Sequence, residues 1–75
     1  MQNCKRNPEF EKRLKSLRRR NRLEMYRLAD LCGISRDLIR KYEAGEAVPR
    51  ADTLAKIADY FGVKMDYLWG VSDEP

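Results

Sequence analysis

Apolar residues recur in this sequence as short runs at helical spacing, and a glycine closes most of these runs. In the clearest run, the apolar residues within 54–61 stand three and four positions apart, and Gly62 follows directly. Gly33 and Gly45 close two earlier runs, and a glycine readily takes the left-handed conformation that ends a helix. No segment has the alternation typical of a strand. The sequence therefore predicts an all-α fold.

The same patterns predict five helices in a compact bundle. The first begins at Pro8, which suits a first helical turn, and ends near Asn21, a residue that tolerates left-handed geometry. The remaining four helices are expected at residues 25–32, 36–44, 51–61 and 65–69. We expect residues 8–70 to form one domain, residues 1–7 to be a flexible N-terminal arm and residues 71–75 to be a disordered tail.

Chain length and residue content argue against an enzyme or a metal site. A domain of 75 residues buries only about 60% of the surface that its unfolded chain exposes, which leaves little room for a deep substrate cleft. The chain has no histidine, and its two cysteines, Cys4 and Cys32, stand far apart. We therefore expect no catalysis, no cofactor and no zinc. With no signal-like or membrane-spanning stretch, a cytoplasmic protein is the simplest expectation.

Positive charge is concentrated at one end of the chain. Residues 1–22 hold nine basic and two acidic side chains, whereas residues 23–75 hold seven basic and ten acidic ones. A basic block of this kind indicates a polyanionic partner, either nucleic acid or an acidic membrane surface. A solvated basic helix face would give the same pattern, so charge alone does not decide between them.

The segment between the second and third predicted helices, Gly33 to Ser35, has the length and the glycine of a helix-turn-helix. At about 100° per residue, one arc of the third helix is polar. Its members are Arg36, Asp37, Arg40, Lys41 and Ala44. Arg36, Asp37 and Lys41 are chemically suited to base edges, and Arg40 to a phosphate. An ordinary amphipathic surface helix would also show this arc.

Glu43 falls at the edge of the apolar arc of the third helix, so it needs a partner if it is half-buried. Arg18, beside the apolar stripe of the first helix, is a candidate for a bidentate ion pair that would join the two helices. A solvated glutamate is the alternative.

The run from Leu28 to Val63 is similar to the Cro and phage-repressor type of helix-turn-helix, also called Xre-like. The similarity extends over about residues 14–69. The parts that carry it are Leu28-Ala29, Gly33-Ile34-Ser35, Ile39, Tyr42-Glu43, Gly45, Pro49, Leu54 and the DYL of residues 66–68. The resemblance implies a lambda-repressor-like five-helix domain that binds double-stranded operator DNA, usually as a dimer, in transcriptional repressors, phage switches or antitoxins.

Carried over by position, the family's base-reading residues fall on Arg36, Asp37 and Lys41, and its structural ion pair falls on Arg18 and Glu43. The phosphate contacts that we expect are Arg18, Arg27, Ser35, Arg40 and Arg50. Two positions depart from the family pattern. Met25 stands where the family often has a phosphate-binding glutamine, and Glu46 lies in a loop that is often basic.

One recognition helix reads too few base pairs to select a site in a genome, so we expect a homodimer on an inverted repeat, mainly monomeric in free solution. The expected interface is Met65, Tyr67, Leu68 and Trp69, although all four could instead pack inside.

Two other functions stay open. The first is a protein-interaction or antitoxin-like module whose scaffold binds a partner protein, and the second is a membrane-surface helix, which the narrow apolar stripe of the first helix disfavours.

Overall fold

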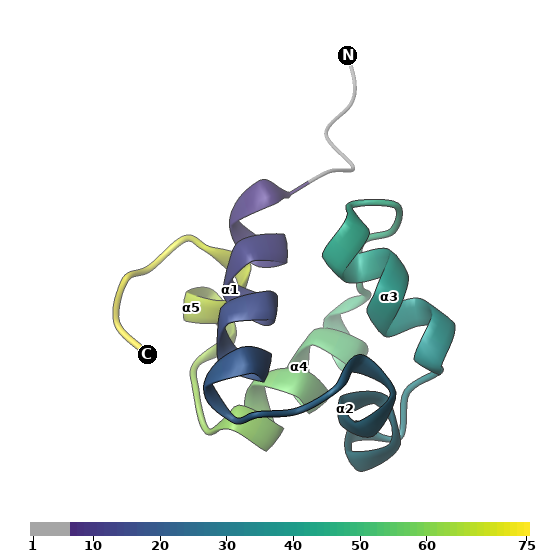
Figure 1. The fold of residues 1–75 in the computed structure, drawn as a ribbon. Coiled ribbons are helices and arrows are strands. Elements are labelled where there is room, and N and C mark those ends of the chain that lie inside the picture. The colour runs from purple at the N-terminus through teal and green to yellow at the C-terminus, as the bar shows by residue number, and fades with distance from the viewer. Residues whose placement is uncertain (1–6) are drawn as a thin grey trace.

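The computed structural model describes residues 7–75, and these form five helices. They are α1 (Pro8–Arg20), α2 (Met25–Cys32), α3 (Arg36–Ala44), α4 (Ala51–Phe61) and α5 (Met65–Trp69) (Figure 1). No β-strand occurs within this described range. The all-α prediction and the expected helix ranges are confirmed.

The turn after α1 differs from expectation. Asn21 keeps φ of −93° and donates a side-chain hydrogen bond to the carbonyl of Leu17 at 2.7 Å. The left-handed conformation falls instead on Arg22, with φ of 56°. Asn21 stays at negative φ, where its amide side chain and its backbone N–H both bond back to the last turn of α1.

The core lies where all five helices meet. α1 contributes Phe10 and Leu14, which are almost fully buried, and the ring of Phe10 contacts the rings of Tyr42 and Trp69 at centroid distances of 6.0 and 5.6 Å. The largest fully buried side chains of the other helices are Leu28, Ile39, Ile57 and Leu68. This shared core fixes α2 and α3 relative to α1.

The C-terminal segment lies against α1. Arg13 donates from Nη1 to the carbonyls of Tyr67 and Ser72, at 2.7 and 2.5 Å, and from Nη2 to the carboxylate of Asp73 at 2.7 Å. These contacts connect residues more than fifty positions apart. The division into an arm, a domain and a tail remains a prediction, and most of the expected arm lies outside the described residues.

Candidate nucleic-acid interface

α2 and α3 form a helix-turn-helix with a tight connection. Gly33 ends α2 in the left-handed conformation with φ of 71°, which a side chain would disfavour, and the N–H of Ile34 bonds back to the carbonyl of Ala29 at 2.9 Å. Ser35 occupies the N-cap position of α3, although its side chain makes no capping hydrogen bond. Leu28 and Ile39 are fully buried beneath the turn, so the angle between the helices is held by packing.

The outward surface of α3, which we call the reading face, consists of Arg36, Asp37, Arg40, Lys41 and Ala44. All of these are exposed except Lys41, which is half-buried. The opposite side of α3 buries Ile39 and Tyr42, as the helical arc predicts, while Leu38 at the edge stays partly exposed. The three candidate base-reading residues, Arg36, Asp37 and Lys41, therefore lie together on one exposed surface.

Arg36 is held by two side chains of α2. Its Nε and Nη2 donate to the two carboxylate oxygens of Asp30, at 3.1 and 2.9 Å, and its guanidinium carbon lies 5.4 Å from the centroid of the Tyr26 ring. The hydrogen bond from Arg36 lowers the pKa of Asp30 and raises that of Arg36 itself, so both groups stay charged.

Asp37 forms ion pairs with the other two cations of the reading face. Its carboxylate accepts from Nε and Nη2 of Arg40, at 3.2 and 3.1 Å, and lies 3.2 Å from Nζ of Lys41. These hydrogen bonds, the one from Lys41 first, lower the pKa of Asp37. Arg40 also lies 3.5 Å from a carboxylate oxygen of Glu46. In the free protein, the reading face is thus largely compensated in charge.

Arg18 and Glu43 are in contact, and they join α1 to α3. Nε and Nη2 of Arg18 donate to the carboxylate of Glu43 at 2.5 and 3.0 Å, and Nη1 donates to the carbonyl of Leu23 at 2.7 Å. The side chains are only 11% and 4% exposed. The hydrogen bond to Glu43 raises the pKa of Arg18. All three nitrogens of this guanidinium are occupied within the protein, which leaves it little capacity for a phosphate.

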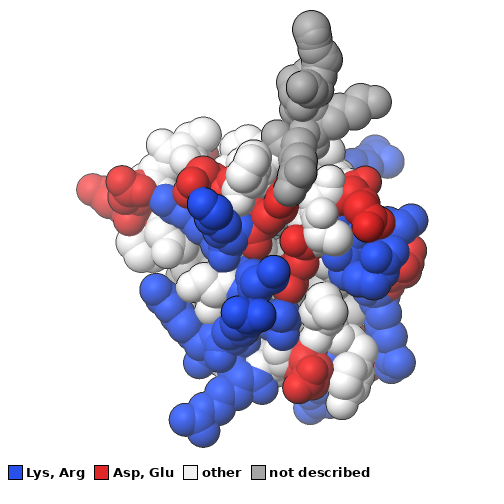
Figure 2. All heavy atoms as spheres, turned by 45° about the horizontal axis from the view of Figure 1, so that its top comes forward, with Lys and Arg blue, Asp and Glu red and all other residues white. Residues whose placement is uncertain are grey.

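Four cations on one side of α1, which we call the α1 stripe, have no such partners. Lys12, Lys15, Arg19 and Arg20 form no ion pair with any carboxylate in residues 7–75. Figure 2 shows Lys and Arg side chains crowded over α1, whereas Asp and Glu side chains lie among them over α3. The stripe therefore carries the stronger positive potential.

A shallow hollow connects the α1 stripe to the reading face. It has a volume of about 260 Å³ and lies where α1, the start of α2 and the end of α3 meet. Lys15 and Arg19 line it from α1, Met25 from α2, and Arg40 and Ala44 from α3. Of the remaining expected phosphate contacts, Arg27, Ser35 and Arg50 are all exposed.

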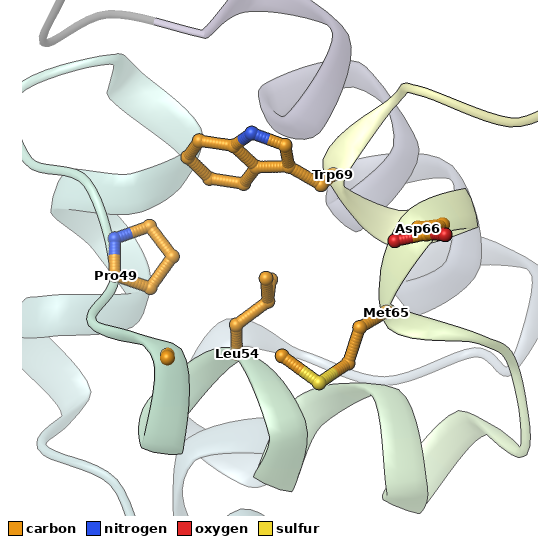
Figure 3. A pocket seen from close by; sticks show the side chains of 6 residues that line it. Pro49, Leu54, Met65, Asp66 and Trp69 are labelled. Carbon is orange, nitrogen blue, oxygen red and sulfur yellow. The ribbon is translucent and has the colours of Figure 1, made fainter.

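The expected dimer surface needs one correction. Leu68 is fully buried, because it packs into the core from the inner side of α5, and it cannot contribute to an interface. Tyr67 and Trp69 are half-buried, and Met65 is exposed. Met65 and Trp69 line an apolar hollow of about 280 Å³ that Pro49, Ala51, Leu54 and Asp66 complete (Figure 3).

Within residues 7–75, no cluster of three potential metal ligands occurs. No helix of this described range is long and apolar enough to cross a membrane. Cys32 is half-buried against the core, and burial raises the pKa of its thiol.

Sequence reasoning missed Asp30 and Tyr26, because nothing in their spacing indicates that they meet Arg36 across the turn.

A family model described as helix-turn-helix matches residues 14–68 of this chain. The SPbeta prophage-derived transcriptional regulator YonR of Bacillus subtilis is 41% identical over 59 residues, covering 79% of this chain and 55% of its own. The cryptic phage CTXphi transcriptional repressor RstR of Vibrio cholerae is 36% identical, covering 83% of this chain and 55% of its own. The chain spans about half the length of these curated relatives. Both are named as transcriptional regulators.

Solved structures share the fold. The SOS-response transcriptional repressor LexA from Eubacterium rectale superposes with a TM-score of 0.80 at 25% identity, covering 91% of this chain and 72% of its own. The fold also forms part of the hydroxypropylphosphonic acid epoxidase of S. wedmorenis, with a TM-score of 0.75 at 24% identity over 88% of this chain and 35% of the epoxidase. The fold alone therefore does not separate regulators from enzymes, and the two curated relatives named above are regulators.

Proposed function

This chain belongs to the Xre/Cro-like helix-turn-helix family of transcriptional regulators, and from that premise we propose that it binds double-stranded DNA sequence-specifically through α3. The observation that carries the proposal is the reading face: a row of charged side chains, exposed on a helix whose other side is anchored in the core. A helix of this kind, preceded by a tight turn, fits the major groove.

Three side chains of the reading face have the chemistry to distinguish base pairs. Arg36 and Lys41 are donors that match O6 and N7 of guanine, and Asp37 is an acceptor that matches N4 of cytosine. Arg40 lies nearer to the hollow beside α1 and is the better phosphate contact. Specificity then arises mainly from Arg36, Asp37 and Lys41.

Phosphate contacts supply most of the affinity. The α1 stripe, with Arg27, Arg50 and the exposed hydroxyl of Ser35, provides donors around the reading face. Arg18 acts mainly by fixing α1 to α3, since Glu43 and the carbonyl of Leu23 occupy its guanidinium. Because these contacts release counterions from DNA, binding should weaken steeply with salt.

The regulator acts as a repressor in the cytoplasm and binds an inverted repeat as a dimer. The relative in Vibrio cholerae and the structural neighbour LexA are both named repressors, which supports this direction of regulation. Two copies related by a two-fold axis would place their α3 helices about 34 Å apart, on half-sites one turn of DNA from each other. Met65 and Trp69, which line the apolar hollow, are the surface proposed to join the copies, whereas the ring of Tyr67 lies against Arg13, 4.4 Å from its guanidinium carbon.

Selection from random duplex DNA tests the proposal. We expect an enriched inverted repeat, and native mass spectrometry should find two copies on it. Arg36→Ala and Lys41→Ala should each relax one base preference, at a cost of about 1 to 3 kcal/mol, whereas Arg40→Ala should weaken all sequences alike. Absence of enrichment would favour the protein-interaction module, and one copy bound tightly to an asymmetric site would exclude the dimer.

A further inference from the structure

The cations of the reading face and those of the α1 stripe differ in whether they pair with carboxylates. Every cation of the reading face has a carboxylate partner: Asp30 binds Arg36, and Asp37 binds Arg40 and Lys41. The α1 stripe has no such partner among the described residues. A surface that only attracted phosphates would gain nothing from these carboxylates, because each one cancels a positive charge. Their presence beside the cations of α3 therefore calls for a role other than attraction.

The contact between Arg36 and Asp30 leaves one edge of the guanidinium available. Asp30 occupies the edge formed by Nε and Nη2. A guanidinium carries five N–H donors in one plane, so the edge formed by Nη1 and Nη2 still has a pair of parallel donors. The ring of Tyr26, 5.4 Å from the guanidinium carbon, limits movement out of this plane. The free edge matches the spacing of O6 and N7 of guanine.

We propose that Asp30 is a specificity-determining residue of the DNA-binding surface, which positions Arg36 so that a guanine, and not a phosphate, is its preferred ligand. The proposal rests on the proposed function, since it needs α3 to face bases. Guanine O6 and N7 can take the free edge of Arg36 while Asp30 remains bound. A phosphate approaching the same edge meets the negative charge of Asp30 beside it and gains less.

Asp30→Asn tests this role, and Asp59→Asn is its matched control. Both substitutions remove one negative charge from an exposed position, and Asp59, on α4, forms no ion pair within the described residues. We expect Asp30→Asn to lower the guanine preference at one base pair by about fivefold or more, the lower end of what a bidentate arginine contact contributes. Its affinity for random duplex should rise several-fold more than that of Asp59→Asn, and Asp30→Glu should retain part of the preference.

The outcomes separate this proposal from the proposed function. If the wild type enriches a motif and Asp30→Asn keeps that motif unchanged, the role of Asp30 is wrong while the function stands. Equal effects of Asp30→Asn and Asp59→Asn would also overturn it, because charge alone would then explain the change. If the wild type enriches no motif, both proposals fail. Equal thermal midpoints of the variants would establish that the loss of preference does not come from unfolding.

Discussion

Replacing Glu43 by Gln should destabilise the domain far more than the small change in size suggests. The carboxylate of Glu43 accepts from both Nε and Nη2 of Arg18, and its side chain is only 4% exposed. The amide would keep the shape and one acceptor, but it would place an NH2 donor against a guanidinium that has only donors. The charge of Arg18 would then be left without its counter-charge in a site that is nearly closed to water.

The expected cost follows from this burial. Removing one partner of a buried ion pair typically costs about 3 to 5 kcal/mol, and the remaining hydrogen bond from Arg18 to the carbonyl of Leu23 places this case at about 3 kcal/mol. For a domain of this size, each kcal/mol lowers the melting temperature by about 4 to 8 °C, so a fall of about 12 to 24 °C is expected. Exposed ion pairs contribute less than about 1 kcal/mol.

Urea unfolding followed by circular dichroism and by the fluorescence of Trp69 measures this cost. Asp30→Asn, which breaks the exposed pair with Arg36, is the control and should cost much less than Glu43→Gln. The double variant Arg18→Met/Glu43→Leu should be more stable than Glu43→Gln, since no buried charge remains. The reasoning is refuted if Glu43→Gln costs no more than the control, or if the double variant loses as much stability as the single variants Arg18→Met and Glu43→Leu together.

Three further predictions concern other parts of the chain. Gly70→Ala should destabilise more than Gly62→Ala in the same urea assay: both glycines have positive φ, but only at Gly70 would the new Cβ lie 2.5 Å from the Cβ of Glu9. An NMR titration should give Asp37 a pKa below its ordinary value of 3.8, and that pKa should rise in Lys41→Ala. Because the folded-state pKa is the lower one, the stability that ionised Asp37 contributes should be present above pH 3.8 and lost as pH falls through the folded-state pKa. Glutamine at all four positions of the α1 stripe should reduce the salt dependence of DNA binding. The slope of log affinity against log salt concentration should become shallower by about 0.9 for each phosphate that the protein no longer neutralises, and the selected motif should stay unchanged.

The helices could be predicted because each is specified locally. Apolar spacing and a following glycine act within one turn of the chain, so α2, α3 and α4 need no knowledge of the rest of the fold. The contact of Glu43 with Arg18 could also be anticipated, because a glutamate at the edge of a buried arc requires a partner, and the first helix has a basic side chain beside its apolar stripe.

The contacts that escaped prediction depend on how separate elements meet. Asp30 reaches Arg36 only because the turn at Gly33 sets the angle between α2 and α3. Arg13 binds the C-terminal segment across more than fifty residues, and no local pattern marks that pairing. The sequence leaves Leu68 either at an interface or in the core, and only the packing of α5 decides: a five-residue helix with one side in the core buries the residue that faces inward.

The difference between the two sets of cations also bears on how affinity and specificity should respond to salt. Cations of the α1 stripe form no ion pairs within residues 7–75. If they contact phosphates, they should release the counterions condensed on the DNA, so this part of the binding should weaken as salt rises. Cations of the reading face start from ion pairs with Asp30 and Asp37, and contacts to bases release few counterions. Raising the salt concentration should therefore reduce binding to random duplex more steeply than it reduces the preference for the selected motif. The ratio of specific to random affinity should then rise with salt, because most of the cations proposed to attract DNA lie on α1, whereas those proposed to read bases lie on α3.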